Sequence, residues 1–577
     1  MLSILGKIWT SKEEDYSEIS TVMNGYGVSQ LVASLAINRV SLAEMADFLE
    51  PRISKQMLDP FSLLDMEKAV VRFIKAIEKS ECICIFADYD VDGATSAALL
   101  INLLKHLNIE HFVYIPDRAK EGYGLSINAV EQILKRASCL VTLDCGSSSY
   151  EEIAFAKSKG LEVIVIDHHM SDRLVTDAVA VVNPNRIDET SQLQYLAAVG
   201  VTYLFLVAVV SRLKKKASYS SLMESFHLLS LLDLVALGTV CDVVPIVRLN
   251  RAFVSQGLKV IRMRTNLGLR TLIDCVNLHE YIRSYHLGFV IGPRINAGGR
   301  VGKADLGVRL LTATCNSIAE QIATVLDEHN TQRKTIEMHA IEEAQSIVEQ
   351  EQEKGLIIVA KDSWHVGVIG IMASRLVEIY NVPVAVISWD GEIGKASCRS
   401  VAGFDFGAII LSAKAMGLLV SGGGHKMAAG FSVNRSKFEE LKVFLQKKFH
   451  TLGLTKTPVR YFDAKLTLES LNLGLLDEIH VLEPFGCGNP IPCFYLQNVN
   501  IVYSKIVRKD HVYCVLGTNS NNKIRITGIA FGAMRNKMGS VLLAKTKESI
   551  SVIVTVQKHS WSGNESVRCV IKDIIQA

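Results

Sequence analysis

The stretch Ile83–Leu100, which reads ICIFADYDVDGATSAALL, decides how this chain folds. A short apolar run leads into three acids at alternate positions, Asp88, Asp90 and Asp92, and Gly93 then opens a segment of small residues and good helix formers. An apolar run that ends in acids and a glycine before a helix is typical of a buried parallel strand and its strand-to-helix turn. Ligands of open α/β sheets bind at the carboxyl ends of such strands.

Carboxylates crowded at one strand end repel one another unless cations neutralise them. Oxygen-rich sites of this kind suit Mg²⁺ or Mn²⁺. This stretch by itself is also compatible with a polar loop whose acids point into water, or with acids that cap the helix N-terminus. The neighbouring strands must decide between these possibilities.

Strand-like and helix-like segments alternate from about residue 80 to residue 166. Short apolar runs predict strands, and the amphipathic segments between them predict helices. This alternation favours a parallel sheet with helices on both faces. We expect strands at 82–87, 111–115, 139–143 and 162–166, and helices at 94–107, 126–136 and 149–159.

Two later strands also end in metal-type ligands. A single acid at a strand end could be a helix cap, but several on one sheet edge are hard to explain in that way, and imidazole beside carboxylates is typical of transition-metal or mixed sites. A further acid, Asp242, follows the apolar run 231–240; it could be a turn residue before Pro245, or it could close a two-metal cluster. The strand-end residues are Asp144 after the third strand, and Asp167, His168 and His169 after the fourth.

The composition is that of a globular protein with several domains. The chain has 577 residues, 49% of them hydrophobic and 21% charged, and about two to four domains are expected for this length. The net charge of only +3 excludes an overall basic field, so any nucleic-acid site must be a local patch. Twelve cysteines without a C-x-x-C pair indicate a reduced protein and argue against zinc.

The apolar segments of the sequence do not predict a membrane span. The first sixteen residues lack the long apolar core of a signal peptide. Of the most apolar later runs, 196–210 is too short to span a bilayer, and 228–247 carries Asp233 and Asp242, which would be costly there. We therefore expect no membrane partner and a cytoplasmic location.

Four of these segments, taken in order, resemble the motifs of the DHH phosphoesterases. They are DYDVDG, LDCG, DHH and GTVCDVVP. Further segments resemble the RecJ-type single-strand DNA exonucleases of that family, and the resemblance covers about residue 80 to the C-terminus. These segments are EGYGL (121–125), GPRINAGGR (292–300), WHVGVIGIMASRL (364–376), GGGHKMAAG (422–430) and EPFGCGNPIPCF (483–494).

The resemblance implies two-metal hydrolysis of phosphodiester bonds, from 5′ to 3′, in single-stranded DNA during repair and recombination. Asp144 is the best candidate to bridge two Mn²⁺ or Mg²⁺ ions, Asp167 would orient the histidines, and His169 would touch the scissile phosphate or act as general acid. The expected ligands are Asp88, Asp90, Asp92, Asp144, His168 and Asp242, with Asp144, Asp167, His168 and His169 as the catalytic residues. The expected substrate-binding residues are Tyr123, Arg294, Asn296, Arg300, Arg399, Gly423, Gly424, His425 and Lys426.

The sequence departs from the family pattern in three places, one of which is that Cys145 and Cys241 stand where other small residues often occur. Many DHH phosphoesterases carry a histidine four residues before the first acid of the D-x-D pair; here that residue is Phe86, and Asp88 supplies the ligand instead. The segment 394–406 keeps Arg399 and Ser400 but lacks a glycine expected before them, which leaves the roles of Ser397 and Cys398 open.

The predicted architecture is a parallel-sheet DHH domain, a long connecting helix, a smaller α/β accessory domain and a C-terminal OB-like β-barrel. Glycines 422–424 could let backbone N–H groups approach a phosphate, or could form a flexible turn. In the last part, short strands with interleaved basic residues (Lys505, Arg508, Lys509, Lys523, Arg525) indicate either a single-strand-binding barrel or a solvated sheet face. The expected boundaries are 1–75 for an N-terminal helical extension, 76–300 for the DHH domain, 301–354 for the connecting helix, 355–455 for the DHH-associated domain and 459–577 for the barrel.

Two rival functions stand against this one, and only the first would share the metal site. A phosphodiesterase of short oligonucleotides or cyclic dinucleotides would not need the barrel. A scaffold that only binds single strands would have lost its ligands, whereas every expected ligand position is filled here. A helicase and a single-strand-binding protein are further candidate partners that the sequence leaves open.

Overall fold

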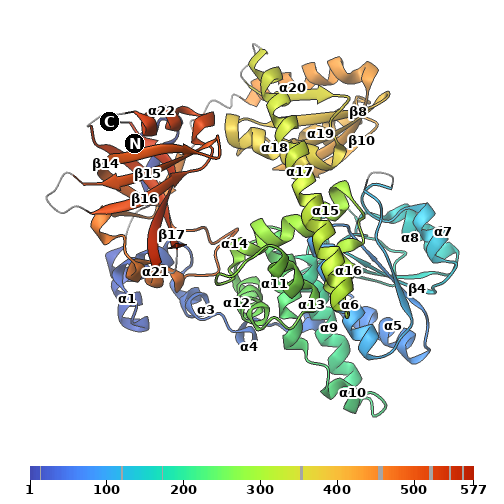
Figure 1. Ribbon diagram of the computed structural model, residues 1–577. Helices are drawn as coiled ribbons and strands as arrows, with labels where there is room; N and C mark the ends of the chain where they lie inside the picture. The colour runs from blue at the N-terminus through green and yellow to red at the C-terminus, as the bar shows by residue number, and fades with distance from the viewer. Residues whose placement is uncertain are drawn as a thin grey trace. The chain divides into compact units, whose positions relative to one another are not determined.

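The computed structural model describes residues 1–12, 15–118, 121–171, 173–350, 355–452, 459–518, 524–544, 548–561 and 564–576 (Figure 1). The chain divides into two compact units. One unit consists of Met1–Leu58, Val243–Gln256 and Lys456–Ala577, and the other of Asp59–Asp242 and Gly257–Thr455. Lys523, one of the basic residues predicted for the barrel, lies outside the described residues.

A parallel five-stranded sheet in the second unit carries the DYDVDG motif. Its strand order is β3-β2-β4-β5-β6, and every neighbouring pair is parallel, as predicted. Strand β6 (Ala180–Val182) was not predicted, because three residues are too few to show a pattern. The other strands are β2 (Ile83–Ala87), β3 (His111–Tyr114), β4 (Cys139–Leu143) and β5 (Glu162–Ile166), with helices α5 (Met66–Glu78), α6 (Val91–His106), α7 (Ile127–Ile133) and α8 (Tyr150–Ser158).

The turn from β2 to α6 explains the sequence of the opening motif. All five residues of β2 are buried, and Asp90 caps α6 by accepting a hydrogen bond from the Gly93 backbone N–H at 3.0 Å. A methyl group on Gly93 would come within 2.3 Å of the Asp88 carbonyl oxygen, so only glycine fits this close approach.

Helices follow the sheet in the chain, and all of them belong to the second unit except the first part of α12 (248–256), which belongs to the first. Helix α11 packs on α6, and the long helix α17 fits the connecting helix predicted within 301–354, with the short α16 before it. The helices are α9 (Ala198–Lys214), α10 (Ser220–Glu224), α11 (Leu232–Cys241), α12 (Arg248–Met263), α13 (Leu267–Cys275), α14 (Ser284–His286), the π-helix η4 (Leu287–Ile291), α15 (Gly292–Val301), α16 (Leu306–Leu311) and α17 (Asn316–Gln350).

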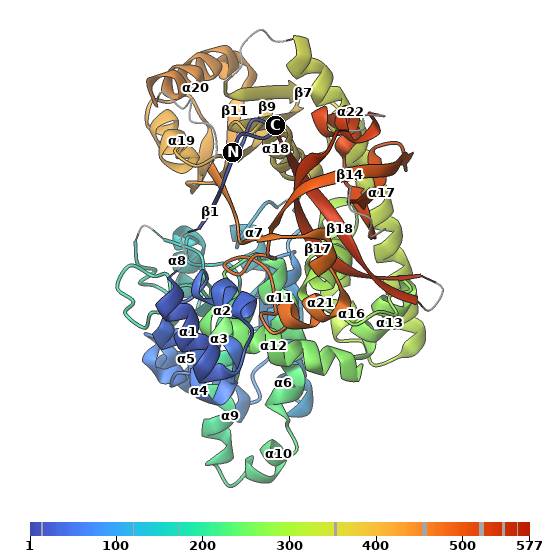
Figure 2. The same cartoon turned by 90° about the vertical axis from the view of Figure 1, so that its left-hand side faces the viewer.

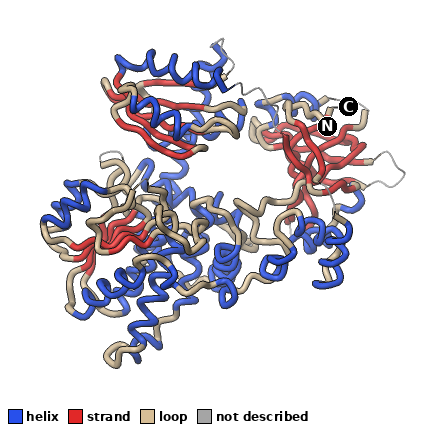
Figure 3. Tube along the Cα trace, turned by 180° about the vertical axis from the view of Figure 1, so that it is seen from behind, coloured by secondary structure: helices blue, strands red, loops and turns tan. Residues whose placement is uncertain are grey.

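The accessory α/β part has a mixed sheet with strand order β10-β11-β9-β8-β7, seen from behind in Figure 3. The glycine-rich run is strand β10, paired antiparallel with β11, so it is neither the loop nor the turn that the sequence suggested. The elements are β7 (Ile357–Lys361), α18 (Val366–Tyr380), β8 (Val384–Asp390), β9 (Ile393–Arg399), α19 (Phe406–Ala415), β10 (Ser421–His425), β11 (Ala428–Asn434) and α20 (Phe438–Leu452).

The C-terminal strands of the first unit close into a barrel, which Figure 2 shows in orange and red. The strand order is β13-β14-β15-β16-β18-β17, and pairing of β14 with β17 completes the ring. This confirms the predicted fold class. The elements are β12 (Val459–Phe462), β13 (Ala464–Leu466), α21 (Leu473–His480), β14 (Phe494–Val507), β15 (His511–Gly517), β16 (Arg525–Ala530), α22 (Lys537–Leu543), β17 (Ile550–Trp561) and β18 (Asn564–Ile575).

Residues 1–58 belong to the first unit, together with the barrel. Strand β1 (Ile8–Ser11) pairs with β12, and the buried side chains of α1 and α2 join the hydrophobic core of the barrel. The expectation of a purely helical extension therefore missed β1, whose pairing partner is far away in sequence. The remaining helices are α1 (Tyr16–Tyr26), α2 (Gln30–Ile37), α3 (Met45–Leu49) and α4 (Ile53–Gln56). Among the described residues, no helix combines the length and the apolar character that crossing a membrane requires.

Candidate metal centre

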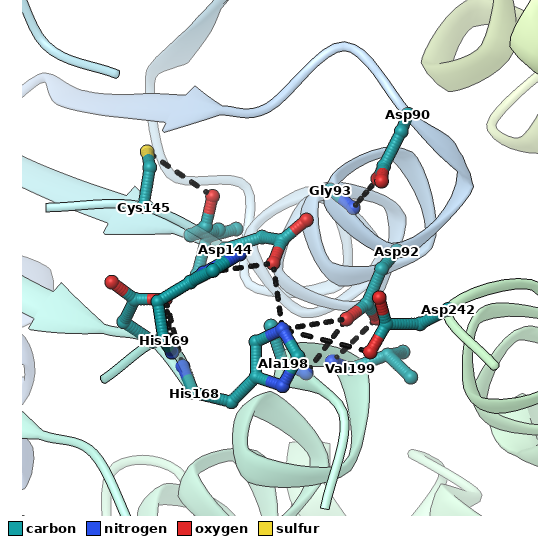
Figure 4. Close-up of polar contacts among 12 residues, drawn as sticks. Asp90, Asp92, Gly93, Asp144, Cys145, His168, His169, Ala198, Val199 and Asp242 are labelled. Carbon is teal, nitrogen blue, oxygen red and sulfur yellow. Dashed lines mark hydrogen bonds and ion pairs between the residues drawn. The ribbon is translucent and has the colours of Figure 1, made fainter. Parts of the chain in front are cut away.

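Acidic and imidazole side chains that follow β2, β4, β5 and α11 converge with Asp92, in the first turn of α6, at the carboxyl edge of the parallel sheet (Figure 4). Within each of three groups, one ligand atom from every residue lies within 4.8 Å of the others. The groups overlap through Asp144 and His168, which is the pattern expected for two adjacent ions. The groups are Asp88, Asp90 and Asp144; Asp92, His168 and Asp242; and Asp144, His168 and His169.

Nε2 of His168 is the focus of the cluster. It lies 3.4 Å from Asp144 Oδ1, 3.6 Å from Asp242 Oδ2 and 4.0 Å from Asp92 Oδ2. Four buried ligand atoms, one each in Asp88, Asp144, His168 and Asp242, have no hydrogen-bond partner among the described residues. Leaving such atoms unpaired inside a protein is costly. Bare oxygen and imidazole donors that face one another fit divalent cations such as Mn²⁺ or Mg²⁺.

The backbone brings these ligands together in specific ways. Asp144 follows β4 with a φ of 61°, a left-handed conformation that is uncommon outside glycine and aims its side chain away from the strand direction. Asp92 is fixed by hydrogen bonds from the Ala198 and Val199 N–H groups at 2.7 and 2.9 Å, at the start of α9. Gly238 lets α11 approach α6, because a methyl group there would lie 2.4 Å from Thr95 Oγ1.

Burial and mutual repulsion hold protons on the metal-free carboxylates. Burial first, and then the neighbouring carboxylates, raise the pKa values of Asp88, Asp144 and Asp242 well above the usual range. The same causes raise the pKa of Asp92 to about 7. Divalent ions would replace these protons. By contrast, burial and the positive His169 lower the pKa of His168 to about 4, so its ring is neutral at pH 7 and can offer a lone pair.

Asp167 holds the two histidines and does not take part in the three ligand groups. Its Oδ1 accepts hydrogen bonds from the His168 N–H at 2.7 Å, the His169 N–H at 3.1 Å and His169 Nδ1 at 2.8 Å, and Oδ2 accepts one from the Ser147 N–H at 3.0 Å. Burial would raise the pKa of Asp167, but the charge and hydrogen bond of His169 outweigh it and the pKa lies far below its usual range. The Asp167 carboxylate is therefore ionised at neutral pH, and its hydrogen bonds fix the positions of His168 and His169.

His169 is a cation at neutral pH. Burial would lower the pKa of His169, but Asp167 raises it to about 9. The His169 ring is partly exposed, and its Nδ1 lies 3.2 Å from the hydroxyl oxygen of Tyr123. That hydroxyl donates a hydrogen bond to the Asp144 carbonyl at 3.1 Å. An imidazolium at the mouth of the cluster can donate to a phosphate oxygen rather than bind a metal.

Helix α15 uses its predicted substrate-binding residues largely for internal contacts. Asn296 accepts a hydrogen bond from the Val91 N–H at 3.2 Å and so fixes the start of α6. Nε of Arg294 donates a hydrogen bond to Oδ1 of Asp327 at 2.7 Å and forms an ion pair with it. Arg300 is half-buried and donates to the Gly367 carbonyl at 3.0 Å, which connects α15 with α18.

The predicted residues of the accessory sheet divide into two sets. Arg399, at the end of β9, is half-buried and donates to Ser397 Oγ at 3.3 Å and the Cys398 carbonyl at 2.8 Å. Gly423, Gly424, His425 and Lys426 lie on β10 and the turn after it, where His425 and Lys426 are exposed. The structure places this second set on an edge strand, and the described residues give it no contact with the metal cluster.

Sequence reasoning missed Arg118. Its guanidinium lies 5.2 Å from the centre of the Tyr89 ring, and its charge acts on the pKa values of Asp88, Arg300 and Arg399. It therefore links the metal cluster electrostatically with two of the three predicted substrate-binding arginines. The signal was its place after β3, because cations there share the ligand-binding edge of the sheet.

Comparison with known proteins identifies the family of this chain. The models of the DHH family N-terminal domain, the DHHA1 domain and the RecJ OB domain match residues 82–239, 352–451 and 462–573. A single-stranded-DNA-specific exonuclease RecJ from Escherichia coli (strain K12) is 36% identical over 546 residues, which are 91% of this chain and 92% of that protein.

Two solved structures cover nearly the whole chain. RecJ in complex with Mn²⁺ from Thermus thermophilus has a TM-score of 0.81 and 26% identity over 99% of this chain and 80% of that one. The complex with Mg²⁺ from the same organism has a TM-score of 0.76 and 25% identity over 99% of this chain and 78% of that one. The chain therefore belongs to the RecJ family of DHH-type exonucleases.

Proposed function

We propose that this chain is a metal-dependent exonuclease that degrades single-stranded DNA from the 5′ end. The observation that carries the proposal is the convergence of Asp92, Asp144 and Asp242 on the unpaired Nε2 of His168. The relatives, which are named as single-stranded-DNA-specific exonucleases, support the substrate. The 5′-to-3′ polarity is what the resemblance of the sequence motifs implies. Work in DNA repair and recombination fits such an activity.

Mn²⁺ or Mg²⁺ is the cofactor of this proposal. Asp88, Asp90 and Asp144 would hold one ion, and Asp92, Asp242 and His168 the other, with Asp144 bridging the pair. A pair of such ions would lower the pKa of a bound water, so that hydroxide is available as the nucleophile. The pair would also stabilise the charge on the attacking and leaving oxygens of the phosphate.

The protein side chains orient the reaction. His169, a cation held by Asp167, donates a proton or hydrogen bond at the phosphate or the leaving oxygen. Tyr123 fixes the Asp144 backbone through its hydroxyl. Arg118 and Arg399 would grip the phosphates that flank the scissile bond, because guanidinium groups match phosphate geometry. Arg300 and Asn296 would hold α15 in place beside them.

An exposed aromatic pair next to α15 offers a place for bases. Tyr285 and Phe289 are 56% and 71% exposed, and their rings stack at 5.1 Å with 24° between planes. Four residues before Tyr285 in the chain, the ring of Tyr281 lies 3.6 Å from the Arg262 guanidinium. Aromatic faces combined with cations are typical of single-strand-binding surfaces and do not read sequence. The pair supports a substrate longer than a dinucleotide.

The test uses single strands labelled at either end. With Mn²⁺, a 5′ label should appear at once as mononucleotide, whereas a 3′-labelled strand should shorten stepwise; blunt duplex and chelated samples should stay intact. Asp144→Asn, which keeps shape but removes a charge, should be inactive. Release of the 3′ label first, or equal attack on duplex, would contradict the proposal.

The same assay separates the rivals. A phosphodiesterase of short oligonucleotides would cleave a dinucleotide and spare long strands, and a binding scaffold would cleave nothing. The match of the RecJ OB domain to residues 462–573 favours long strands. A helicase, a single-strand-binding protein and a cytoplasmic location stay predictions.

A further inference from the structure

Two asparagines that follow strand β6, Asn183 and Asn185, lie beside the histidines of the metal centre, and all of these residues belong to the second unit. The parallel pairing of β5 with β6 brings the ends of the two strands together. The Asp167 N–H, just after β5, donates a hydrogen bond to the Val182 carbonyl at 3.1 Å. The turn after β6 therefore lies next to the segment 167–169.

Asn185 holds the backbone of His168. Its Nδ2 donates hydrogen bonds to the His168 carbonyl at 2.6 Å and to the Gln194 carbonyl at 3.2 Å. Because both partners are acceptors, the amide nitrogen and not the amide oxygen must face them. The side chain thus fixes the carbonyl of the residue whose Nε2 meets the carboxylates of the metal centre.

Asn183 holds the backbone of His169. It is completely buried, and its Nδ2 donates hydrogen bonds to the His169 carbonyl at 2.8 Å and to Ser147 Oγ at 2.7 Å. Its Oδ1 accepts a hydrogen bond from the Asn185 N–H at 2.7 Å, so the three contacts agree on one orientation of the amide. This last bond also couples the two asparagines to each other.

The backbone of the two histidines is consequently held from both sides. Asp167 accepts hydrogen bonds from both of their N–H groups, and the two asparagines donate to both of their carbonyls. With these four groups fixed, a peptide unit cannot turn without leaving a polar group of this partly or fully buried turn unpaired, which is costly. The directions of the two rings therefore depend on the asparagines as well as on Asp167.

We propose that Asn185 is a positioning residue for the metal ligand His168, and that Asn183 is a positioning residue for His169 at the scissile phosphate. Loss of either amide frees one carbonyl, lets that peptide unit turn, and displaces the ring attached to it. Groups in metal and catalytic sites must keep their positions within about 0.5 Å. Loss of the groups that orient them typically lowers metal affinity or activity by about 10–100-fold. The proposal rests on the metal centre of the proposed function.

The first experiment measures Mn²⁺ binding to the full chain without DNA, by calorimetry and by electron paramagnetic resonance of free Mn²⁺. Asn185→Ala should weaken the binding of at least one Mn²⁺ by about tenfold or more. Its hydrolysis of single strands should fall at low Mn²⁺ and recover at high Mn²⁺, which a general loss of folded protein would not do. Asn102→Ala is the matched control, because Asn102 is also half-buried and its amide donates to the Ala98 carbonyl within its own helix, α6, at 2.7 Å. It should bind Mn²⁺ as the wild type does.

The second experiment measures kcat of Asn183→Ala on labelled single strands. Since His169 donates a proton or hydrogen bond and is not a ligand, kcat should fall by about tenfold or more and should stay low at saturating Mn²⁺. Asn183→Ser, which leaves a polar group in the same buried place, is a second variant with the same expected result. Either of the two, when folded, decides the point.

Unfolding midpoints in chelator show which variants are folded. Wild-type Mn²⁺ affinity in folded Asn185→Ala would overturn the role of Asn185 at His168. A wild-type kcat in folded Asn183→Ala, or a kcat that recovers at high Mn²⁺, would overturn the role of Asn183 at His169. A wild-type chain that binds no Mn²⁺ would overturn the proposed function together with both roles.

Discussion

Nε2 of His168 lies 3.4 Å from Oδ1 of Asp144, and neither atom has a hydrogen-bond partner among the residues that the structure describes. Side chains from the ends of two adjacent strands, β5 and β4, thus face each other inside the protein. Desolvated polar atoms in this position cost free energy unless a cation satisfies them. The pair therefore links the sheet topology directly to the proposed chemistry.

The metal-free chain should lose stability as the pH rises. Folding raises the pKa values of Asp88, Asp144 and Asp242 well above the usual range, and that of Asp92 to about 7. The folded chain then binds more protons than the unfolded chain above about pH 4, so the free energy of unfolding falls with rising pH through about 7 and beyond. The measurement is the thermal unfolding midpoint in chelator between pH 5 and 8. Added Mn²⁺ should remove most of the loss, and a midpoint in chelator that does not fall over this range would contradict the proposed cluster.

Asp233→Asn should stabilise the protein at pH 8 but not at pH 4. Asp233 is buried in the first turn of α11, and burial raises its pKa to about 6. Holding it ionised in the folded state costs about 3 kcal/mol above pH 6, from roughly two units of pKa at about 1.4 kcal/mol each, and this cost vanishes below the unfolded pKa. Asparagine keeps the acceptor for the Leu234 N–H. Unfolding midpoints of both proteins at the two pH values check this; a stabilisation of equal size at both would argue against a buried charge.

Gly238→Ala should impair both stability and hydrolysis. The new methyl group would lie 2.4 Å from Thr95 Oγ1, 2.7 Å from Val199 Cγ1 and 3.0 Å from Asp92 Oδ1, so α11 must move away from α6 and carry Asp242 with it. Overpacking of this kind costs about 1–3 kcal/mol. Gly25→Ala, in α1, is the control, because no atom lies within 4 Å of its new methyl group. Full activity of Gly238→Ala would show that this helix contact does not set the ligand geometry.

Tyr285→Ala combined with Phe289→Ala should weaken the binding of long single strands. Stacking contributes about 1–3 kcal/mol per base, so the KM for a long strand should rise about tenfold or more while kcat on a dinucleotide stays the same. Leu229→Ala removes an equally exposed apolar side chain elsewhere and should change neither value. If the KM stays at the wild-type value, the exposed pair serves a protein partner or no partner.

Local patterns predicted the parallel sheet and most of the acidic and imidazole side chains that meet at its edge. The strand expected at 82–87 is β2 at Ile83–Ala87, since its apolar run and the acids after it are signals contained in one short segment. The ligands then follow from parallel topology, which puts the ends of β2, β4 and β5 at one edge. Contacts between distant segments carried no such signal. Two such contacts depend on the whole fold: strand β1 pairs with β12, and Arg294 pairs with Asp327 in α17.

The glycine-rich run shows how an ambiguous pattern resolves. Consecutive glycines suit a phosphate loop, a turn or a strand where backbones approach closely. Here Gly424 has a φ of 144°, and a methyl group on it would lie 2.4 Å from the Ala429 Cα atom. Glycine is therefore required because strands β10 and β11 pack closely at this position. No single stretch of sequence reveals such a contact between strands.

Titration of the chelated and reloaded protein with Mn²⁺ is the sharpest test of whether Asp144 is shared between two ions. The wild type should bind two Mn²⁺ per chain, and Asp144→Asn, with an unchanged unfolding profile in chelator at pH 5, should lose at least one of them together with hydrolysis of labelled single strands. Two ions bound with wild-type affinity by the folded Asp144→Asn chain would refute the shared site.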